Sequence, residues 1–368
     1  MGKRELFIAA AFIVVAVVAY QLTAPAPKPG ERHFSLRDMF TGIHRGMRAN
    51  TAEAATTKSA TIAVNAAVTE LRLTASRSVS LTIVGEKRSD IGYEAAIRST
   101  GPDEASARQY ASKVELISDD LNMAQKLDLK LPGQGEQSGE LTLRVPNRLL
   151  VRIEGAGKVI ASDVRAIDLK NLSGDVTISN ISERVTGSHR NGELTVTHTG
   201  GLELALAGSR ARLSDIQGPI TVTARSGECV IAKSKGTVDA TLQNGDFTVT
   251  EQAGPIHVAG EQGTLRVVAP DKDLAIDVRR MQVDVTLTSP VPATIVTSGE
   301  TLKLSLAGPP GLALDAVTTS GGEIRVSDLA ATPTRQDRET RLTATIGGGG
   351  PRVVLRNSSG DIVIGLRK

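Results

Sequence analysis

A glycine recurs every nine residues through the middle of this sequence. Six glycines in a row keep the interval, namely Gly218, Gly227, Gly236, Gly245, Gly254 and Gly263. Within each interval the third and fifth residues are mostly apolar, as in Ile220 and Val222 or Ile256 and Val258. A glycine, two inward residues and a polar turn describe one short strand followed by a corner. The chain is therefore built from many short arms, and no arm can bury its apolar residues alone.

A second period, twice as long, is superimposed on the first. One kind of corner has Ser-Gly or Asn-Gly followed by an acid, and the alternate kind has Gly-Pro at Gly218 and Gly254. Two arms therefore make one coil of about 18 residues. The predicted turn residues are Gly174, Gly192, Gly218, Gly227, Gly236, Gly245, Gly254, Gly263, Gly299 and Gly360. This pattern predicts an all-β fold, a single-stranded β-solenoid similar to a parallel β-helix, whose stacked coils share one core.

The repeats divide the chain downstream of the N-terminal segment into two regions. Residues 151–368 carry the regular solenoid repeats, whereas residues 59–150 alternate polar and apolar positions at irregular intervals. We expect residues 59–150 to form an irregular β region that caps the solenoid. Within it, the polar stretch 99–110 predicts a loop or a short helix.

The repeat is interrupted near its C-terminal end. The charged stretch 332–341 and the glycines at 347–350 predict loops or kinks, and a last strand is expected at 361–364. A solenoid that ends on this strand would leave an open sheet edge, protected only by Arg367 and Lys368.

The N-terminal segment predicts a membrane location. A charged head at residues 1–5 precedes an apolar stretch at residues 6–22 that has no polar face. Its length is at the lower limit for a transmembrane helix and slightly above that of a signal-peptide core. Cleavage after it would leave Pro25 or Pro27 at the new N-terminus, which favours a retained signal anchor over a cleaved signal. The sole cysteine, Cys229, lies far downstream, which excludes a lipoprotein.

Residues 23–58 connect this stretch to the β region. They contain a Pro-rich spacer, a candidate basic amphipathic helix at 35–48 and an Ala/Thr-rich linker at 49–58. The helix would either lie on anionic headgroups or pack on the domain, and a mobile linker is the third alternative. The candidate membrane-surface residues are Leu36, Arg37, Met39, Phe40, Ile43, Arg45, Met47 and Arg48.

The charges on the two sides of the apolar stretch conflict about its orientation. Lys3 and Arg4 favour a cytoplasmic N-terminus, but several cations also follow the stretch. The short head is similar to the start of a secretory signal. We therefore expect a cell-membrane protein whose bulk is extracytoplasmic, in the periplasm or at the cell surface.

Three segments resemble a known family. Residues 141–146, 149–153 and 173–178, with the later repeats of the last of these, are similar to the bacterial putative-adhesin β-solenoid family of unknown function. The resemblance covers roughly residues 60–368. It implies a solenoid similar to autotransporter adhesin heads and an association with the cell envelope, and it implies no catalytic residues.

Neither metal binding nor catalysis is predicted. Nonapeptide calcium rolls need recurring aspartates, but the sixth position of this repeat carries a single carboxylate, Asp277. The pairs Asp175 with Glu193 and Glu228 with Asp246 lie one coil apart, the kind of carboxylate pair that a glycosidase needs. Each of them follows a corner glycine, however, where short acidic side chains suit turns.

The histidines and the cysteine have simple interpretations. His189 and His198 fall on opposite arms of a coil and should not share a metal, and surface positions are expected for both and for His257. Cys229 is at an inward position, where it would fill the core. The net charge of +3 argues against a dedicated nucleic-acid surface.

These observations favour a non-enzymatic, membrane-anchored envelope protein that displays a β-solenoid for adhesion, scaffolding or protein interaction. No cofactor and no metal are expected. The expected partners are the membrane and an unknown protein or envelope component, with self-association through the solenoid ends as a further option. Two alternatives are a β-helix enzyme that acts on cell-surface polysaccharide and a polymerising scaffold that faces the cytoplasm.

Overall fold

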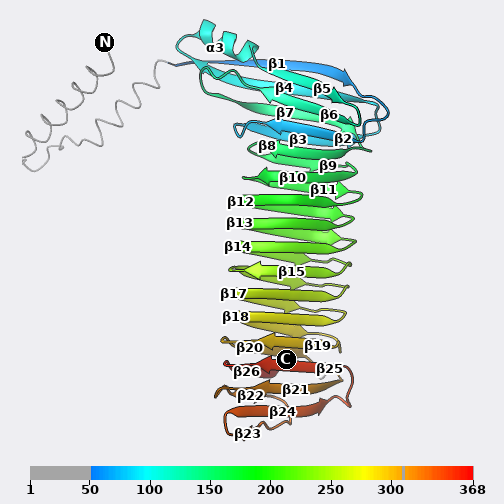
Figure 1. The fold of residues 1–368 in the computed structure, drawn as a ribbon, viewed down its shortest axis with the longest axis vertical. Helices are drawn as coiled ribbons and strands as arrows, with labels where there is room; N and C mark the ends of the chain where they lie inside the picture. The colour runs from blue at the N-terminus through cyan, green and yellow to red at the C-terminus, as the bar shows by residue number, and fades with distance from the viewer. Residues whose placement is uncertain (1–50, 309–310, 368) are drawn as a thin grey trace, which may run out of the picture.

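The computed structural model describes residues 51–308 and 311–367, which form an all-β rod with one helix at its N-terminal end (Figure 1). The predicted head, apolar stretch, Pro-rich spacer and basic amphipathic helix lie outside the described residues. Among the described residues, no helix is long and apolar enough to cross a membrane.

The elements fall into three groups along the rod. The N-terminal group consists of β1 (Ala52–Ala63), β2 (Glu70–Ala75), β3 (Val79–Glu86), β4 (Asp90–Gly101), α3 (Glu104–Ser112), β5 (Glu115–Leu121), β6 (Ala124–Lys130) and β7 (Gln137–Pro146). The central group consists of β8 (Leu150–Gly155), β9 (Val159–Ser162), β10 (Ala166–Leu172), β11 (Val176–Ile181), β12 (Val185–Thr199), β13 (Leu202–Ile216), β14 (Ile220–Ala232), β15 (Val238–Gln243), β16 (Asp246–Thr250), β17 (Ile256–Val268), β18 (Leu274–Leu287), β19 (Ala293–Thr297) and β20 (Leu302–Ala307). The C-terminal group consists of β21 (Leu312–Thr318), β22 (Ile324–Ser327), β23 (Thr334–Gln336), β24 (Glu339–Ile346), β25 (Arg352–Asn357) and β26 (Ile362–Arg367).

Successive coils of the central group stack in parallel. Ile220 lies opposite Val238, and Val238 lies opposite Ile256, so each of these coils takes 18 residues. The coil from Val185 to Leu202 takes 17 residues, and the coil from Leu274 to Ala293 takes 19. The coil length of about 18 residues predicted from the glycine period is therefore confirmed, with departures of one or two residues that include the 16-residue coil from Leu150 to Ala166.

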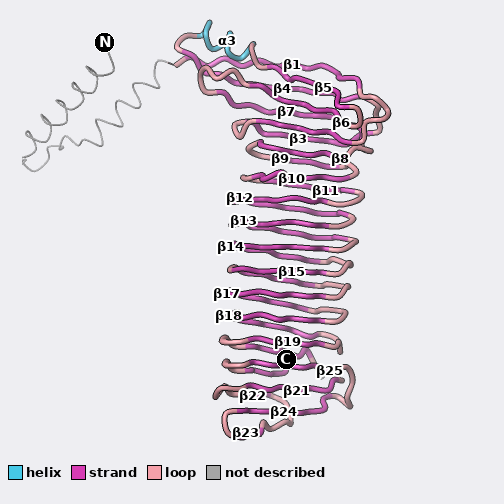
Figure 2. The backbone as a smooth tube through the Cα atoms, in the orientation of Figure 1, coloured by secondary structure: helices cyan, strands magenta, loops and turns pink. Residues whose placement is uncertain are grey.

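Each coil has two arms that lie on opposite sides of the core, and the stacked coils make two parallel sheets. The first-arm sheet contains β8, β10, β15, β19 and the leading halves of β12, β13, β14, β17 and β18. The second-arm sheet contains β9, β11, β16, β20 and the trailing halves of the same five strands. Figure 2 shows the strands as regular rungs with a turn at each side of the rod.

Apolar residues from both sheets fill the space between them. Along each strand buried and exposed positions alternate, as in β15, so that Val238, Ala240 and Leu242 point inward. Register places each inward residue on another in the next coil, as with Ile256 on Val238. A fully buried Val, Leu or Ile contributes about 1.5–3 kcal/mol relative to an exposed one. The core is thus a continuous column that no single coil could form.

The corners bring the backbones of neighbouring coils into close contact. Of the predicted turn glycines, Gly174, Gly192, Gly227, Gly245, Gly263 and Gly299 have φ between +95° and +126°. The other four lack a positive φ, but a Cβ at any of them would lie within 2.2 Å of a carbonyl oxygen in the neighbouring coil; they are Gly218, Gly236, Gly254 and Gly360. Glycine therefore meets two demands, a positive φ at most Ser-Gly and Asn-Gly corners and, at both edges of the rod, close approach to the backbone of the neighbouring coil.

Both ends of the rod depart from sequential stacking. At the N-terminal end, β2 pairs with β6 and β8, while β3 pairs with β7 and β9, so the β2–β3 coil lies between two later coils. At the C-terminal end, β25 lies between β19 and β21, and β26 lies between β20 and β22. In Figure 1 the red strands accordingly lie above the orange ones.

This arrangement corrects the prediction of an open edge at 361–364. The last strand is an interior strand with a parallel neighbour on each side. Antiparallel strands complete both ends instead: β24 pairs with β21 and β23 with β24, while β4 pairs with β7, β1 with β4 and β5 with β6. The edge strands at the C-terminal end, β22 and β23, have four and three residues. Such short edges offer little to a pairing strand.

Three further expectations need correction or refinement. Residues 52–58, predicted as linker, belong to β1, because alternate small residues of this Ala/Thr-rich segment are half-buried in a long antiparallel register with β4. Part of the charged stretch 332–341 forms the β23–β24 hairpin rather than a loop. For the stretch 99–110 the helix alternative is correct, since α3 begins after Asp103, whose carboxylate accepts from the Ser106 amide at 2.7 Å.

The corner geometry predicts which glycines tolerate a side chain. In Gly236→Ala the new Cβ would lie 1.9 Å from the Gly218 carbonyl oxygen, so the two coils have to separate. We expect the free energy of unfolding to fall by more than about 2 kcal/mol, as for other large steric conflicts. Gly133→Ala is the control, because its Cβ would meet nothing within 4 Å. Urea denaturation of both variants measures the difference, and equal stability would contradict the close-approach argument.

Candidate interaction surface

The outward side chains of the rod form columns that run along its axis. In-register stacking places Thr223, Thr241, Ala259 and Asp277 side by side on the first-arm sheet. Two residues further along each strand, Arg225, Gln243, Glu261 and Arg279 make a parallel column of longer side chains. A row of short side chains beside a row of long ones leaves a shallow hollow between them.

This hollow has a volume of about 380 Å³ and spans β14, β15, β17 and β18. A second hollow of about 400 Å³ shares Asp277 and Arg279 with the first and continues over β19, β25 and β21. We call the two together the first-arm groove. Since it crosses from coil to coil, its long direction follows the rod axis.

The floor of the second hollow includes apolar and ion-paired residues. Val296 is 39% exposed there, although most side chains of its size in the rod are buried. Arg356 lies 2.8 Å from Asp315, which also contacts Arg352 at 3.0 Å. Hydrogen bonds from Arg356 and Arg352 lower the pKa of the Asp315 carboxyl below its usual value. This end of the groove is therefore fixed by a partly buried ion pair.

The first hollow contains charged side chains that do not pair with the other residues lining it. Arg225 and Arg279 make no ion pair with any residue in 51–308 or 311–367, and the same holds for Asp277. Glu261 contacts Arg280 at 3.8 Å, a loose ion pair outside the hollow. Exposed pairs of this kind contribute little to stability, so these side chains are available to a partner.

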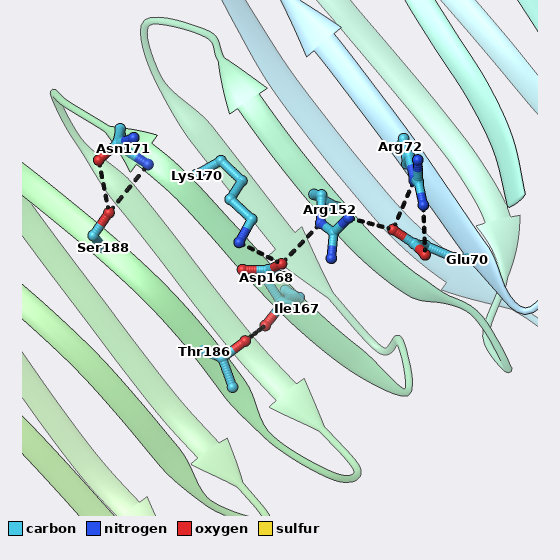
Figure 3. Close-up of polar contacts among 9 residues, drawn as sticks. All are labelled: Glu70, Arg72, Arg152, Ile167, Asp168, Lys170, Asn171, Thr186 and Ser188. Carbon is cyan, nitrogen blue, oxygen red and sulfur yellow. Dashed lines mark hydrogen bonds and ion pairs between the residues drawn. The ribbon is translucent and has the colours of Figure 1, made fainter.

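A second charged cluster, on β2, β8 and β10, has a structural explanation. Arg152 lies 3.0 Å from Glu70 and 2.8 Å from Asp168, and Lys170 lies 3.1 Å from Asp168 (Figure 3). Glu70 also pairs with Arg72 on its own strand. The cluster crosses the place where the β2–β3 coil meets β8, which is out of sequence order. It thus ties the N-terminal end to the regular coils.

One acid of each carboxylate pair considered for catalysis makes an ion pair with an arginine. Asp246 lies beside Glu228 on the second-arm sheet, and Arg210 lies between Glu193 and Glu228. Arg210 contacts Glu228 at 3.4 Å, and Arg212 contacts Glu193. These ion pairs give Glu193 and Glu228 a structural explanation, whereas Asp175 and Asp246 have no ion-pair partner among the described residues. Within the described ranges, no group of three His, Cys, Asp or Glu side chains is placed to hold a metal ion.

His189 is buried, which corrects the expected surface position. Its Nε2–H donates to the Gly174 carbonyl at 2.8 Å, and its Nδ1 lies 2.9 Å from the Ser209 hydroxyl, the donor that a neutral ring requires. Gly174 belongs to the preceding coil and Ser209 to the following one. Ser209 stands where neighbouring coils have Gly192 and Gly227. This buried side chain therefore links three coils, and burial lowers its pKa.

The two other histidines in the described ranges lie on the surface, as expected. His198 is exposed and has a φ of +53° at a corner. His257 lies in β17, where its Nδ1 is 2.9 Å from the Asp239 carboxylate of the previous coil. His189 and His198 are on opposite arms of one coil, as the repeat predicted.

Cys229 is an inward residue of β14, as expected from the repeat. It stacks between Ala211 and Phe247 of the adjacent coils. Burial raises the pKa of its thiol to about 12. A thiol in this environment is a core residue and not a nucleophile.

Sequence reasoning missed the first-arm groove. The 18-residue period alone would have placed Thr223, Thr241, Ala259 and Asp277 in one column, and their small size was a usable signal. What the period could not show is that Arg225 and Arg279 make no ion pair with a carboxylate of the described residues, because this depends on side-chain geometry.

Comparison with known proteins gives one family and several distant structures. The sequence model of the Toastrack DUF4097 family matches residues 68–365. Among solved structures, the chain is similar to a putative adhesin from Parabacteroides merdae, with 11% identity and a TM-score of 0.29, covering 85% of this chain and 97% of that one. It is also similar to a putative adhesin from Parabacteroides distasonis, with 13% identity, a TM-score of 0.29 and the same coverage.

A third similar structure is a putative cell adhesion protein from Clostridium sporogenes, with 11% identity and a TM-score of 0.20, covering 85% of this chain and all of that one. No match was found among curated proteins.

His189 should make stability depend on pH. Its folded pKa lies below the ordinary value of 6.5, so its contribution is fully present above pH 6.5 and is lost as pH falls toward the folded pKa. We expect the thermal midpoint of the wild type to fall more between pH 7 and pH 5 than that of His189→Gln. His198→Asn is the control, since it removes an exposed histidine and should leave the dependence unchanged. An NMR titration of the His189 ring above its ordinary pKa would contradict the prediction.

Cys229 should report on the integrity of the core. Because the thiol is buried and its pKa is about 12, we expect no labelling by a chromophoric disulfide reagent in the folded protein at pH 8. In 6 M guanidinium chloride the chain should react with one equivalent, since the sequence has one cysteine. Rapid labelling under native conditions would show that this part of the stack is open.

Proposed function

This chain belongs to the Toastrack DUF4097 family, and from that premise we propose that it is a non-enzymatic binding protein of the cell envelope, whose β rod presents the first-arm groove to a partner protein. The observation that carries the proposal is the continuity of the groove. Two hollows of about 380 and 400 Å³ join at Asp277 and Arg279 on a surface fixed by sheet register.

The chemistry of the groove fits an extended segment of a partner protein. Arg225 and Arg279 offer guanidinium groups that make no ion pair with any residue the structure describes, and Val296 offers an exposed apolar contact further along. A peptide that runs along the rod would meet these groups in order, with carboxylates toward the arginines and an apolar side chain on Val296. Arginine at a preformed surface makes strong bonds to carboxylates, because its planar guanidinium group binds them in a bidentate manner.

The position of the groove fits attachment at the N-terminal end. The chain enters the rod through β1, at the end opposite to β21 and β24 (Figure 1). If residues 6–22 anchor the protein, the rod would project its C-terminal end from the bilayer. The groove spans β14 to β21 and would then lie in the outer part of the rod.

Two alternatives have less support. A polysaccharide-cleaving enzyme would need free paired carboxylates, whereas arginines on neighbouring strands contact Glu193 and Glu228. A scaffold that polymerises through its ends would need accessible edges. The long strand β1 is bridged to the end of α3, since Lys58 Nζ donates to the carbonyls of Ser112 and Val114 at 2.8 and 2.6 Å.

Site-specific photocrosslinking in the native host tests the partner. A benzophenone amino acid at Thr241 or Ala259, in the groove, should give a discrete crosslinked adduct after irradiation. The same residue at Thr177 or Thr195 on the second-arm sheet is the matched control and should give none. Equal adducts from both sheets, or none from the groove, would contradict the assignment of the interface.

Protease accessibility tests the location. The rod should be degraded, or its epitope lost, when protease is added to intact cells or after the outer envelope is opened. A cytoplasmic marker protein should survive under the same conditions. If the rod survives until the cytoplasmic membrane is broken, the envelope part of the proposal is wrong, whatever the crosslinking shows.

A further inference from the structure

A third hollow lies on the opposite sheet, near the C-terminal end of the rod. It has a volume of about 410 Å³ and crosses β17, β18, β20, β26 and β22 on the second-arm sheet. It is separate from the first-arm groove, because the two sheets face away from each other. We call it the basic hollow, defined by Arg266, Asp284, Lys303, Ser305, Gly365 and Arg367.

The hollow is present because one position in an outward column is a glycine, which has no side chain. Register aligns Thr286, Ser305, Gly365 and Ser327 in one column. Gly365 is thus an outward position without a side chain, between two serines. A Cβ there would lie 2.6 Å from the Ser327 hydroxyl, and the next nearest atoms are at 3.8 Å or more. Hydroxyl groups of Ser305 and Ser327 border the gap.

More cationic than acidic side chains surround this gap. Arg266 and Lys303 come from the neighbouring column, with Asp284 between them, and Arg367 lies two residues beyond Gly365. Asp284 is the one carboxylate among the lining residues, which gives the hollow a formal charge of +2. None of these four side chains has an ion-pair partner within 4.0 Å in the described chain.

Arg325, which follows Val363 in the column that contains Lys303, provides a contrast. Arg325 on β22 also lies on this sheet, but it contacts Glu323 and Asp361, both at 3.1 Å. Its charge is satisfied by two carboxylates. Arg325 thus differs from Arg266, Lys303 and Arg367, which make no ion pair with any described residue.

We propose that the basic hollow binds a phosphoryl group. Guanidinium and ammonium groups beside serine hydroxyls are the donors that a tetrahedral oxyanion with several acceptor oxygens requires. The gap at Gly365 lets the anion approach the sheet, and Lys303 and Arg367 reach it from its two sides. The group can be supplied by a free phosphomonoester or by a phospholipid headgroup, and the two sources are distinguished below.

The test uses the full-length chain held in neutral phosphatidylcholine nanodiscs. One arm titrates glycerol phosphate by calorimetry, and the other measures capture of phosphatidylglycerol vesicles against phosphatidylcholine vesicles. In at least one arm the wild type should bind. The double variant Lys303→Gln/Arg367→Gln should weaken that binding by about tenfold or more, because two charge-assisted contacts are lost. Binding only in the first arm identifies a free phosphomonoester, and binding only in the second identifies a headgroup.

Three single variants sharpen the result. Asp284→Asn removes the one carboxylate and should strengthen binding. Gly365→Ala fills the gap at small structural cost, because the Ser327 hydroxyl can rotate away, and it should weaken binding. Arg325→Gln is the matched control and should have no effect. Thermal midpoints equal to that of the wild type establish that all variants fold.

The proposal is overturned if neither probe binds, or if the double variant binds as well as the wild type. It is also overturned if Arg325→Gln weakens binding as much as the double variant does, because the attraction would then be a diffuse property of the face.

Discussion

Close stacking of backbone on backbone at the corners is the constraint on which the rest of this structure depends. Parallel strands of successive coils lie about 4.8 Å apart, and the corners have to keep the same spacing while the chain reverses. At Gly236 and Gly254 no side chain fits, because a backbone carbonyl of the preceding coil occupies the space. Every inward and outward position downstream of a corner follows from this spacing, since a slip of one residue would turn the apolar side chains outward.

A stack of parallel coils exposes an unpaired strand edge at each end. In this chain both ends are completed in the same manner. At each terminus one coil is inserted out of sequence order, and antiparallel strands then cover the stack. Antiparallel pairing suits an end because consecutive strands can be joined by tight turns, whereas a further parallel coil would expose another full edge. The central coils can therefore remain uniform, while the ends carry the irregular sequence.

The sequence period predicted the features of the fold that repeat from coil to coil, and it did not predict the features that depend on long-range pairing. Coil length, two kinds of corner, inward Cys229 and the opposite arms of His189 and His198 all follow from the nine-residue period. The interior place of β26 could not be predicted, since its partners β20 and β22 are set by long-range pairing and not by local pattern. His189 was misplaced for a related reason. Its inward position was readable, but the Gly174 carbonyl and Ser209 hydroxyl that satisfy the ring become neighbours only after stacking.

The candidate sites follow the same division. In a solenoid the core is built from inward residues, so outward positions are free to vary without loss of the fold. A surface feature then arises where an outward column changes in size or charge, as at Ala259 on one sheet and Gly365 on the other. The columns in which charges alternate, such as Glu193, Arg210 and Glu228, neutralise themselves and stabilise the stack. Columns that leave arginine or lysine unpaired have no such structural role. Within residues 51–308 and 311–367 such unpaired charges line the first-arm groove and the basic hollow, and this is the ground on which we propose both as binding surfaces.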